Sequence, residues 1–538
     1  MAAPNPIAPV LIAGGGPVGM TLALELARQG VRSRLFERAY DTTRHPKMDI
    51  TNGRSMELFR RLGLAEPLRA AAVPADHPLD VAWVTSMAGR ELHRFRYASP
   101  NESRRRYAEI NDGAQPLEPP MRVSQVVIEP ILKAAVLAQP LIDARWGMAV
   151  EDAGQDRDQA WFVVRDRRTD RTETVHGRWL AACDGGGSRV RQAVGIGLEG
   201  KHAVANRYMI HFRSEARDLL QRFGVAWHYQ SPKGTLIAQN DRDVWTLHAR
   251  FPDARDPASV DPKATLAAFI GAEIPAEILV ANPWTPHLLL ADRYRAGRVF
   301  LAGDAAHQYI PTGGYGMNTG IADAVALGWM LAAVERGWGG PRLLDAYEAE
   351  RRPIGRINRD WAEAHTGVRL DIALAYLRCP DAETNDDDHS SLAAAIAKAG
   401  NLENEAYGLE FAYRYDASPL IAPILANESG QAPANAAASI PAAAWPGMRA
   451  PSFLLDDGSA LFDRLDPAGF TLLRFVARAD AAPFLESDVP VRLCDIDLPR
   501  ARDVYGADFA LIRPDGHLAW RGPVATADAL RIARGAAG

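Results

Sequence analysis

Residues 10–19 read VLIAGGGPVG, and the unit that they open ends at the acidic residue Glu37. The apolar run before the glycines predicts a buried strand, the stretch after them predicts a helix, and a second apolar run before Glu37 predicts another strand. At such a turn Gly14 permits tight bending, Gly16 lets the backbone approach a pyrophosphate, and Gly19 lets the helix pack closely on the strand. Glu37 can accept hydrogen bonds from the hydroxyls of an adenosine ribose, and the helix N-terminus attracts the anion. The segment therefore predicts a dinucleotide site in an α/β domain.

The length and composition favour a globular protein of several domains. A chain of 538 residues is too long for one hydrophobic core, so we expect two or three domains. Its 47% hydrophobic and 24% charged residues are typical of soluble proteins. The net charge of −5 provides no bulk attraction for a polyanion, so we expect no nucleic-acid partner and interpret Arg104–Arg106 as a solvated loop.

The 3 cysteines, Cys183, Cys379 and Cys494, lie far apart and form no Cys-x-x-Cys pair. This spacing argues against a disulfide framework, a metal site such as zinc, and a dithiol redox centre. It favours a cytoplasmic location, where thiols stay reduced. Residues 1–9 carry no basic side chain, and the apolar stretch after them contains charged residues, so we expect neither a signal peptide nor a membrane span.

The hydrophobic pattern predicts that the nucleotide fold is interrupted and then resumed. Helical spacing predicts short helices around Met56 and within Ser124–Gln139. Alternating segments from Arg145 to Arg250 predict a mostly antiparallel sheet, and a buried strand followed by a helix returns after Arg298. The predicted units are a discontinuous nucleotide-binding domain (1–80, 120–200 and 285–377), a substrate-binding domain (81–119 and 201–284), a helical connector (378–445) and a C-terminal unit (446–538).

Two further motifs narrow the predicted dinucleotide to a flavin. Residues 183–191 read CDGGGSRVR, which fits the pattern D-G-x-x-S-x-x-R, and residues 303–307 read GDAAH before a glycine-rich loop. An aspartate at a strand end, here Asp304, can accept a hydrogen bond from a ribityl chain. The glycines behind it give backbone N–H groups access to the isoalloxazine edge. We interpret the neighbouring His307 as structural rather than as a proton shuttle.

In this order and spacing, the three motifs resemble those of the single-component flavoprotein aromatic hydroxylases, the family of p-hydroxybenzoate hydroxylase and phenol hydroxylase. The resemblance spans nearly the whole chain. It implies an α/β fold, with a Rossmann-like FAD-binding domain and an inserted, mostly antiparallel β-sheet substrate domain. Residues 446–538 resemble the thioredoxin-like C-terminal domain of the phenol hydroxylase branch. Because they lack Cys-x-x-Cys, we expect a role in packing or subunit contact instead of dithiol exchange.

The resemblance also implies which residues bind the cofactor. On the ADP half of FAD these are Gly14, Gly16, Gly19, Glu37 and Arg38. At the pyrophosphate, the ribityl chain and the ring they are Arg44, Gln125, Asp304, Pro311, Gly316, Met317 and Asn318. Asp184 and Arg191 match family positions described as helping both FAD and NAD(P)H.

For the substrate, Asp49 falls where phenol hydroxylase carries the aspartate that contacts the substrate hydroxyl. Our hypothesis is that burial raises the pKa of Asp49 and that it accepts the phenolic proton. The alternative is a loop aspartate that caps the helix around Met56. Two positions that assist substrate binding in phenol hydroxylase align here with Gln239 and Leu247, so the substrate is left open.

Other residues are candidates for the pocket wall. Trp227, Tyr229 and His248 can line it together with Gln239 and Pro311, although aromatic residues in a sheet more often belong to the core.

The resemblance implies an NAD(P)H-dependent monooxygenase that uses FAD and O2, through a C4a-hydroperoxyflavin, to hydroxylate a phenolic compound. The electron donor is NADPH or NADH, and the chain is expected to pair as a homodimer, as is common in the family. One alternative is a tailoring oxygenase of a polyketide or antibiotic ring system, since the same fold serves both. An alternative of another class is a flavin-binding sensor or scaffold without turnover.

Overall fold

The computed structural model describes residues 8–251, 256, 259–422, 432–433 and 436–536. Its nucleotide domain is built on a 6-stranded sheet with the order β19-β20-β11-β1-β2-β7. All neighbouring strands run parallel except β19 and β20. The strands are β1 (Val10–Ala13), β2 (Ser33–Glu37), β7 (Ile142–Trp146), β11 (Trp179–Ala182), β19 (Arg295–Ala296) and β20 (Val299–Leu301). Central β1 is buried throughout, as expected for a parallel strand that reads as one apolar run.

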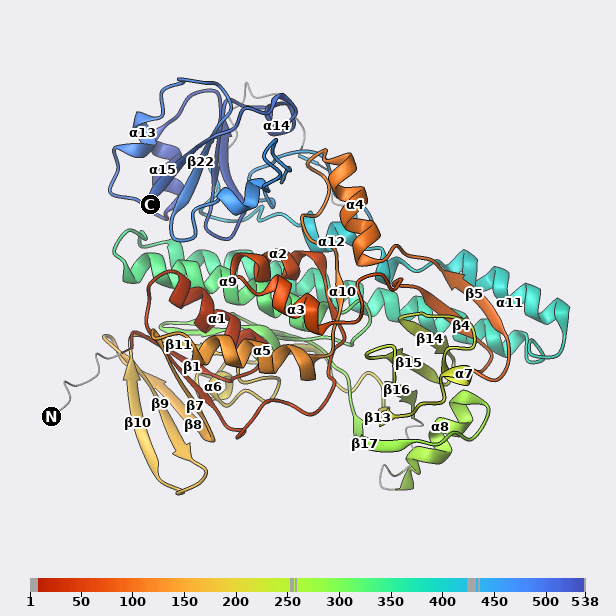
Figure 1. Ribbon diagram of the computed structural model, residues 1–538. Coiled ribbons are helices and arrows are strands. Elements are labelled where there is room, and N and C mark those ends of the chain that lie inside the picture. Colours follow the sequence, from red (N-terminus) through yellow and green to blue (C-terminus); the bar gives the residue numbers. More distant parts are fainter. Residues whose placement is uncertain (1–7, 252–255, 257–258, 423–431, 434–435, 537–538) are drawn as a thin grey trace.

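Helices pack against this sheet (Figure 1). Helix α1 (Pro17–Arg28) begins directly after the glycine turn and packs against α5 (Gln125–Leu137) and α9 (Tyr315–Glu335). Helix α9 is long and apolar enough to span a membrane by length and composition, but 83% of its most apolar 18-residue stretch is buried inside the protein. Its neighbours are α10 (Leu343–Arg378) and α2 (Gly53–Arg61), so α9 is the central core helix.

The strands of the expected antiparallel region from Arg145 to Arg250 do not form one sheet but are divided among several sheets. Strands β8 (Met148–Gln155), β9 (Ala160–Asp166) and β10 (Thr172–Gly177) form a 3-stranded antiparallel sheet beside the nucleotide domain. Buried side chains of β9, such as Phe162, join the core of that domain. Alternation alone does not reveal which partner a strand pairs with, and this is why a single sheet was expected.

The inserted sheet has 7 strands in the order β17-β13-β16-β15-β14-β4-β5. All pairs are antiparallel except β14 with β4. The strands are β4 (Val81–Val84), β5 (Glu91–Phe95), β13 (Arg207–Arg213), β14 (His228–Ser231), β15 (Gly234–Ala238), β16 (Val244–Arg250) and β17 (Glu277–Trp284). One face packs on its own core, around Trp245 and Tyr229, with α8 (Pro262–Ile270). The other face is turned towards the nucleotide domain, where it lines a cavity.

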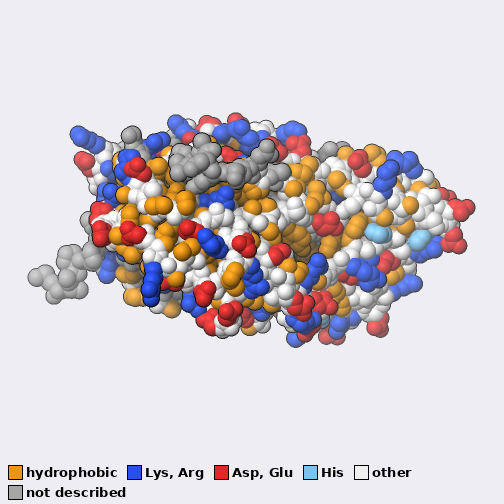
Figure 2. All heavy atoms as spheres, turned by 90° about the horizontal axis from the view of Figure 1, so that it is seen from above, with side chains coloured by type: hydrophobic (Ala, Val, Ile, Leu, Met, Phe, Trp, Pro, Cys, Tyr) orange, Lys and Arg blue, Asp and Glu red, His pale blue; other side chains and the backbone are white. Residues whose placement is uncertain are grey.

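Smaller elements complete this part of the molecule. Residues 104–106 belong to helix α4 (Pro100–Ile110) rather than to a loop, and Arg104 pairs with Glu66 and Glu118. The remaining short elements are β3 (Ile50–Thr51), α3 (Ala65–Ala71), β6 (Met121–Arg122), α6 (Arg189–Ala193), β12 (Leu198–Lys201), α7 (Arg217–Leu220), β18 (Leu288–Ala291) and β21 (His307–Gln308). On the face shown in Figure 2, basic and acidic side chains are interspersed.

The described residues of the predicted connector include the helices α11 (Asp386–Ala399) and α12 (Tyr407–Phe411) and a 3-10 helix (Leu402–Asn404) between them. Helix α11 packs against β5 and α10, so it lies on the side of the molecule that carries the inserted sheet. The alanine-rich stretch at the end of the connector lies partly outside the described residues, and the domain boundaries given above stay a prediction.

The C-terminal unit is a 4-stranded sheet with the order β23-β22-β24-β25, in which only β22 and β23 are parallel. Its elements are β22 (Phe470–Arg474), α13 (Ala482–Leu485), β23 (Val491–Asp495), α14 (Pro499–Tyr505), β24 (Phe509–Ile512), β25 (Leu518–Gly522) and α15 (Ala527–Ala533). The unit sits on the outer side of α9 and α2 (Figure 1). Arg513 fixes it there, because its guanidinium donates to both oxygens of Glu350 in α10 at 2.6 and 2.7 Å and to Asp515 at 2.6 Å.

Replacing Arg513 with Met is expected to lower the free energy of unfolding by about 3–5 kcal/mol, because Glu350 and Asp515 would remain as buried, uncompensated charges. Chemical denaturation measures this difference. The control is Arg531→Met in α15, which removes only an exposed pair with Asp528 and is expected to cost less than about 1 kcal/mol. Equal effects of the two substitutions would contradict a docking role for Arg513.

Candidate active site

The glycine turn after β1 is shaped by backbone packing. Gly14 has φ +103°, and a Cβ at Gly14 would overlap the carbonyl oxygen of Cys183. A Cβ at Gly19 would overlap the carbonyl oxygen of Gly14 in the same way. Gly16 differs, because apart from its own chain neighbours no described residue lies within 4 Å of the position that its Cβ would take. Gly14 and Gly19 are therefore required by the fold, whereas Gly16 leaves space open at the N-terminus of α1.

Glu37 lies at the end of β2, next to this turn. Its Oε2 accepts a hydrogen bond from Gly15 N at 2.7 Å, and its Oε1 accepts one from Ala39 N at 2.7 Å. The carboxylate is thus held at the glycine turn, at the place where an adenosine ribose is expected. Arg38 contributes its carbonyl oxygen to Arg167, and the exposed Arg44 lies nearby in sequence; neither side chain lines the cavity described below.

A cavity of about 1310 Å³ begins at Gly16 and runs between the nucleotide domain and the inserted sheet. Its volume exceeds the roughly 300–1,000 Å³ of a site for one drug-sized ligand, so it has room for a cofactor and a substrate together. The nucleotide side contributes predicted cofactor residues to its wall: Gly16, Gln125, Asp304, Pro311, Gly316 and Met317. The sheet side contributes Trp227 and Gln239 from the predicted substrate residues.

Asp304 follows β20 in a short 3-10 helix (Gly303–Ala305) and opens onto the cavity. The protein around it limits hydration, which raises the pKa of Asp304, although His307 and Lys47 oppose this shift. Asn318 does not face this cavity. Its side-chain amide accepts from Asn52 N at 3.1 Å and donates to Gly314 O at 2.7 Å, so it fixes the start of α9, whose first turn carries Gly316 and Met317.

Asp184 and Arg191 connect the middle motif to the same region. Arg191 donates to Gly186 O at 3.0 Å and to Ala305 O at 3.1 Å, and so it ties two loops of the cofactor side together. Asp184 Oδ1 is buried with no partner among the described residues, and burial raises the pKa of this carboxyl group. An unsatisfied buried acceptor is a position where a ligand donor is expected. With the open space at Gly16 and the length of the cavity, these residues fit FAD.

Asp49 lies at the junction of the two sides, just before β3. Trp227 Nε1 donates a hydrogen bond to Asp49 Oδ2, and His228 Nε2 lies 3.5 Å from the same oxygen. No described residue is bonded to Oδ1, and Asp49 lines the cavity, so this oxygen is available to a ligand. The cap of the following helix α2 is Asn52, which accepts from Ser55 N at 2.9 Å, so Asp49 does not cap it.

The expected direction of the Asp49 pKa was wrong. Burial raises it, as expected, but the interactions with His228 and the hydrogen bond from Trp227 outweigh burial, and the net pKa of Asp49 lies below its usual value. Burial lowers the pKa of His228 despite the neighbouring carboxylate. At neutral pH the site therefore holds an ionised aspartate beside an uncharged histidine.

The comparisons with known proteins agree with this geometry. A family model described as an FAD binding domain matches residues 7–362, and one described as the C-terminal part of an aromatic-ring hydroxylase matches residues 443–536. The chain belongs to the FAD-dependent aromatic-ring hydroxylases. The resemblance stated from the motifs is confirmed, as is the mixed α/β fold with an FAD-binding domain.

Two relatives and one solved structure are similar to this hydroxylase over nearly its whole length. The FAD-dependent monooxygenase apdD of Emericella nidulans is 35% identical, over 95% of this chain and 87% of its own. The 4-methyl-5-nitrocatechol 5-monooxygenase of Burkholderia sp. is 32% identical, over 95% of this chain and 93% of its own. The rebeccamycin biosynthetic enzyme RebC with reduced flavin superposes with a TM-score of 0.86 at 33% identity, over 99% of this chain and 100% of its own.

Tyr229 is the predicted substrate residue that the structure places elsewhere. Its ring is fully buried in the core behind the inserted sheet, and its hydroxyl donates to Gly224 O at 2.6 Å. Its neighbours His228 and Gln230 face the cavity instead, because successive strand residues point to opposite faces. Gln239 lies on the cavity wall, where its Oε1 is buried and has no partner among the described residues. His248 also lies on this wall, and burial lowers its pKa to about 4.

Sequence reasoning missed two groups on the cavity wall of the hydroxylase. One is His228, and the other is the pair Arg207 and Arg250. The period of two along β16 was the available signal, because a cavity-facing His248 places Arg250 on the same face.

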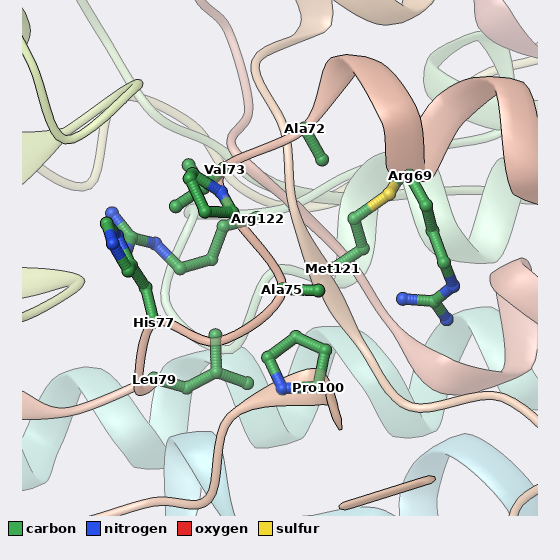
Figure 3. A pocket seen from close by; sticks show the side chains of 10 residues that line it. Arg69, Ala72, Val73, Ala75, His77, Leu79, Pro100, Met121 and Arg122 are labelled. Atoms are coloured by element: carbon green, nitrogen blue, oxygen red, sulfur yellow. The ribbon is translucent and has the colours of Figure 1, made fainter. Parts of the chain in front are cut away.

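Two other hollows lie outside this site. Figure 3 shows one of them, lined by Arg69, His77 and Arg122, with a volume of about 10 Å³ that suffices for a single water. Here Arg122 and His77 both contact the buried Asp241, at 2.8 and 3.0 Å. A second chamber of about 430 Å³ adjoins the large cavity across Trp227.

The contrast between Gly16 and Gly14 provides a test of cofactor placement. Gly16→Ala is expected to leave the melting temperature of the FAD-free hydroxylase nearly unchanged, since Gly16 has an extended backbone (φ −74°, ψ −179°) and free space. It is expected to weaken FAD binding roughly 10-fold or more, because the methyl group occupies the phosphate approach. Quenching of flavin fluorescence measures binding. Gly14→Ala is the matched control and is expected to destabilise the apoprotein itself; normal FAD binding by Gly16→Ala would place the cofactor elsewhere.

The lowered pKa of Asp49 predicts a pH dependence. The interactions of its ionised form contribute to stability above the ordinary pKa of 3.8 and are lost as the pH falls through the lower, folded-state value. Asp49 is therefore expected to produce no inflection in the pH profile of kcat/KM above about pH 5. Profiles of the wild type and of Asp49→Asn check this. An inflection near neutral pH that disappears in Asp49→Asn would show that the pKa is raised instead.

Proposed function

We propose that the hydroxylase uses NADPH or NADH and O2 to hydroxylate a phenolic aromatic compound. The observation that carries the proposal is the single cavity in which the cofactor residues Gly16 and Asp304 and the ionised Asp49 meet. Bound FAD would supply the chemistry of oxygen activation. The residues of the chain would bind, orient and desolvate the substrate.

Asp49 would act on the substrate hydroxyl through its free Oδ1. A phenolic O–H that donates to a carboxylate pushes electron density into the ring, at the ortho and para carbons, which an electrophilic oxygen then attacks. Trp227 holds the other oxygen of Asp49 and so fixes the direction of this hydrogen bond. With its low pKa, Asp49 serves better as an ionised acceptor that orients the hydroxyl than as the final carrier of its proton.

A larger substrate is a second candidate, because the cavity is large. A volume of about 1310 Å³ leaves room for more than a single ring beside a cofactor. A tailoring role on a polyketide or another fused ring system would use the same residues. The geometry of the cavity therefore decides which compounds are tested.

The C-terminal unit is proposed to be a thioredoxin-like domain with a packing role. The parallel and antiparallel strand pairs of its sheet and the buried contact of Arg513 with α10 support this role. Cys494 is the one cysteine of this unit, and it is free. A cytoplasmic location and a homodimer stay predictions.

The proposal predicts NAD(P)H oxidation that is stimulated by substrate and yields hydroxylated product. Phenols, resorcinols, hydroxybenzoates and fused-ring phenols are incubated with the FAD-loaded protein, and NAD(P)H loss is compared with product by mass spectrometry. At least one compound is expected to accelerate oxidation with coupled product formation. A protein that binds FAD but responds to none of them would be a sensor or scaffold.

Asp49→Asn is expected to lower kcat for a productive phenol by roughly 100-fold, within the range of positioned acid–base groups, while FAD binding is retained. The reason is that an amide can no longer accept the hydrogen bond as an anion. The yield of product per NAD(P)H should fall as well. Trp227→Phe is the comparison, since it keeps the carboxylate and removes only its orienting donor; it is expected to have a smaller effect. An unchanged rate and yield in Asp49→Asn would refute the role of Asp49.

A further inference from the structure

Two arginines face each other at one end of the inserted sheet. Arg207 in β13 and Arg250 in β16 are direct partners in the antiparallel register, and both line the cavity. Like charges directly opposite each other on one face of a sheet are destabilising. Burial and the nearby charges of Arg250 and Arg369 lower the pKa of Arg207 to about 10, so it stays charged at neutral pH. This arrangement costs stability unless something else compensates the two charges.

The other basic groups on the nearby wall are already paired. Arg369 binds Glu403 with its closest contact at 2.6 Å, and Lys201 binds Glu363. Among the residues that the structure describes, neither Arg207 nor Arg250 forms an ion pair; the only side-chain hydrogen bond of Arg207 is to Asn206 O at 3.0 Å. At this end of the cavity, Arg207 and Arg250 are therefore two positive charges that no described residue compensates.

The register of the sheet places this pair far from Asp49. His228, which contacts Asp49, is aligned through Ile237 with Thr246 on β16, and Arg250 lies four residues further along that strand. Four residues span about 13 Å, and the two strand spacings from β14 to β16 add about 10 Å sideways. The two ends of the cavity are thus about 16 Å apart on the sheet. A single benzoate ring cannot reach both.

We propose that Arg207 and Arg250 bind a carboxylate at the end of an elongated aromatic substrate whose phenolic end lies at Asp49. The inference rests on the proposed function and specifies its substrate class. The N–H donors of a guanidinium match the two oxygens of a carboxylate, and the charges of the two groups are opposite. Trp284 is aligned with Arg207 on β17 and also lines the cavity, where it offers an aromatic surface beside the anion site. The sheet face between the two ends presents His248, Thr235 and Met209 to the body of the substrate.

The test uses the full-length, FAD-loaded protein and two probes of the same shape, 4′-hydroxybiphenyl-4-carboxylate and its neutral carboxamide. Binding is followed by the change in flavin absorbance, without NAD(P)H, and turnover is measured separately. The wild type is expected to bind the carboxylate roughly 10- to 100-fold more tightly than the carboxamide, as for charge-assisted hydrogen bonds. In the Arg207→Gln/Arg250→Gln double variant this preference should disappear, with carboxamide binding little changed.

The matched control is Arg213→Gln, which removes a charge from the same strand at an exposed position paired with Asp243 and Glu277. It should keep the preference. The single variant Arg250→Gln, expected to lose part of the preference, decides the question if the double variant does not fold. The inference is overturned if the wild type shows no preference for the carboxylate. It is also overturned if the preference persists in the Arg207→Gln/Arg250→Gln double variant.

A second arm separates the substrate from the nicotinamide cofactor, whose phosphates are also anionic. The dissociation constant for NADPH, from the rate of flavin reduction, should be the same in the wild type and the variants. A loss confined to NADPH assigns the arginines to the electron donor and overturns the inference. If the wild type hydroxylates both probes equally, the inference about the arginines is overturned while the proposed function stands. If the protein hydroxylates no phenol, the proposed function itself is refuted.

Discussion

The cofactor side of the molecule depends on one buried carboxylate, Asp323 in α9. Its Oδ2 accepts from Gly303 N at 3.2 Å and lies 2.9 Å from His307 Nε2, and its Oδ1 accepts from Arg351 Nε at 2.8 Å. A charge that is removed from water in this way is tolerated only when its partners are fixed. The pairing therefore fixes the position of the loop that carries Asp304 relative to α9 and α10, and His307 has the structural role that its sequence context indicated.

The same constraint reaches the C-terminal unit. Arg351 donates to the hydroxyl of Tyr415 at 3.1 Å, and the guanidinium of Arg513 lies 5.3 Å from the centre of the Tyr415 ring. Buried charges thus follow one another from the cofactor loop through α10 to the outer sheet. A unit none of whose described residues lines the large cavity is in this way bound to the helices that shape the cavity. This gives a physical reason for its presence in an enzyme whose chemistry does not require a dithiol.

The sequence predicted what local backbone geometry dictates. Gly14 and Gly19 are required by close contacts within one strand–turn–helix unit, so their spacing alone was sufficient, and the same holds for Asp304 at a strand end. Properties that arise between distant segments could not be predicted. Tyr229 was expected in the pocket because the sequence does not show which face of the sheet its side chain is on. The direction of the Asp49 pKa was misjudged because the partners that lower it, Trp227 and His228, are far away in sequence, at a separation of 178 residues for Trp227.

The cavity also shows why the electrostatics of a site must be considered as a whole. At one end Asp49 is negatively charged, because its hydrogen-bond donors lower its pKa by more than burial raises it. At the other end Arg207 and Arg250 are positively charged, although they repel each other. Opposite charges at the two ends of a partly desolvated cavity create a field along its length. A neutral ring gains little from that field, whereas a molecule with a hydroxyl donor at one end and an anion at the other is aligned by it. Orientation of the ring against the cofactor would then be achieved before any contact with the reacting carbon is made, and the inserted sheet would determine regiochemistry through charge as well as through shape.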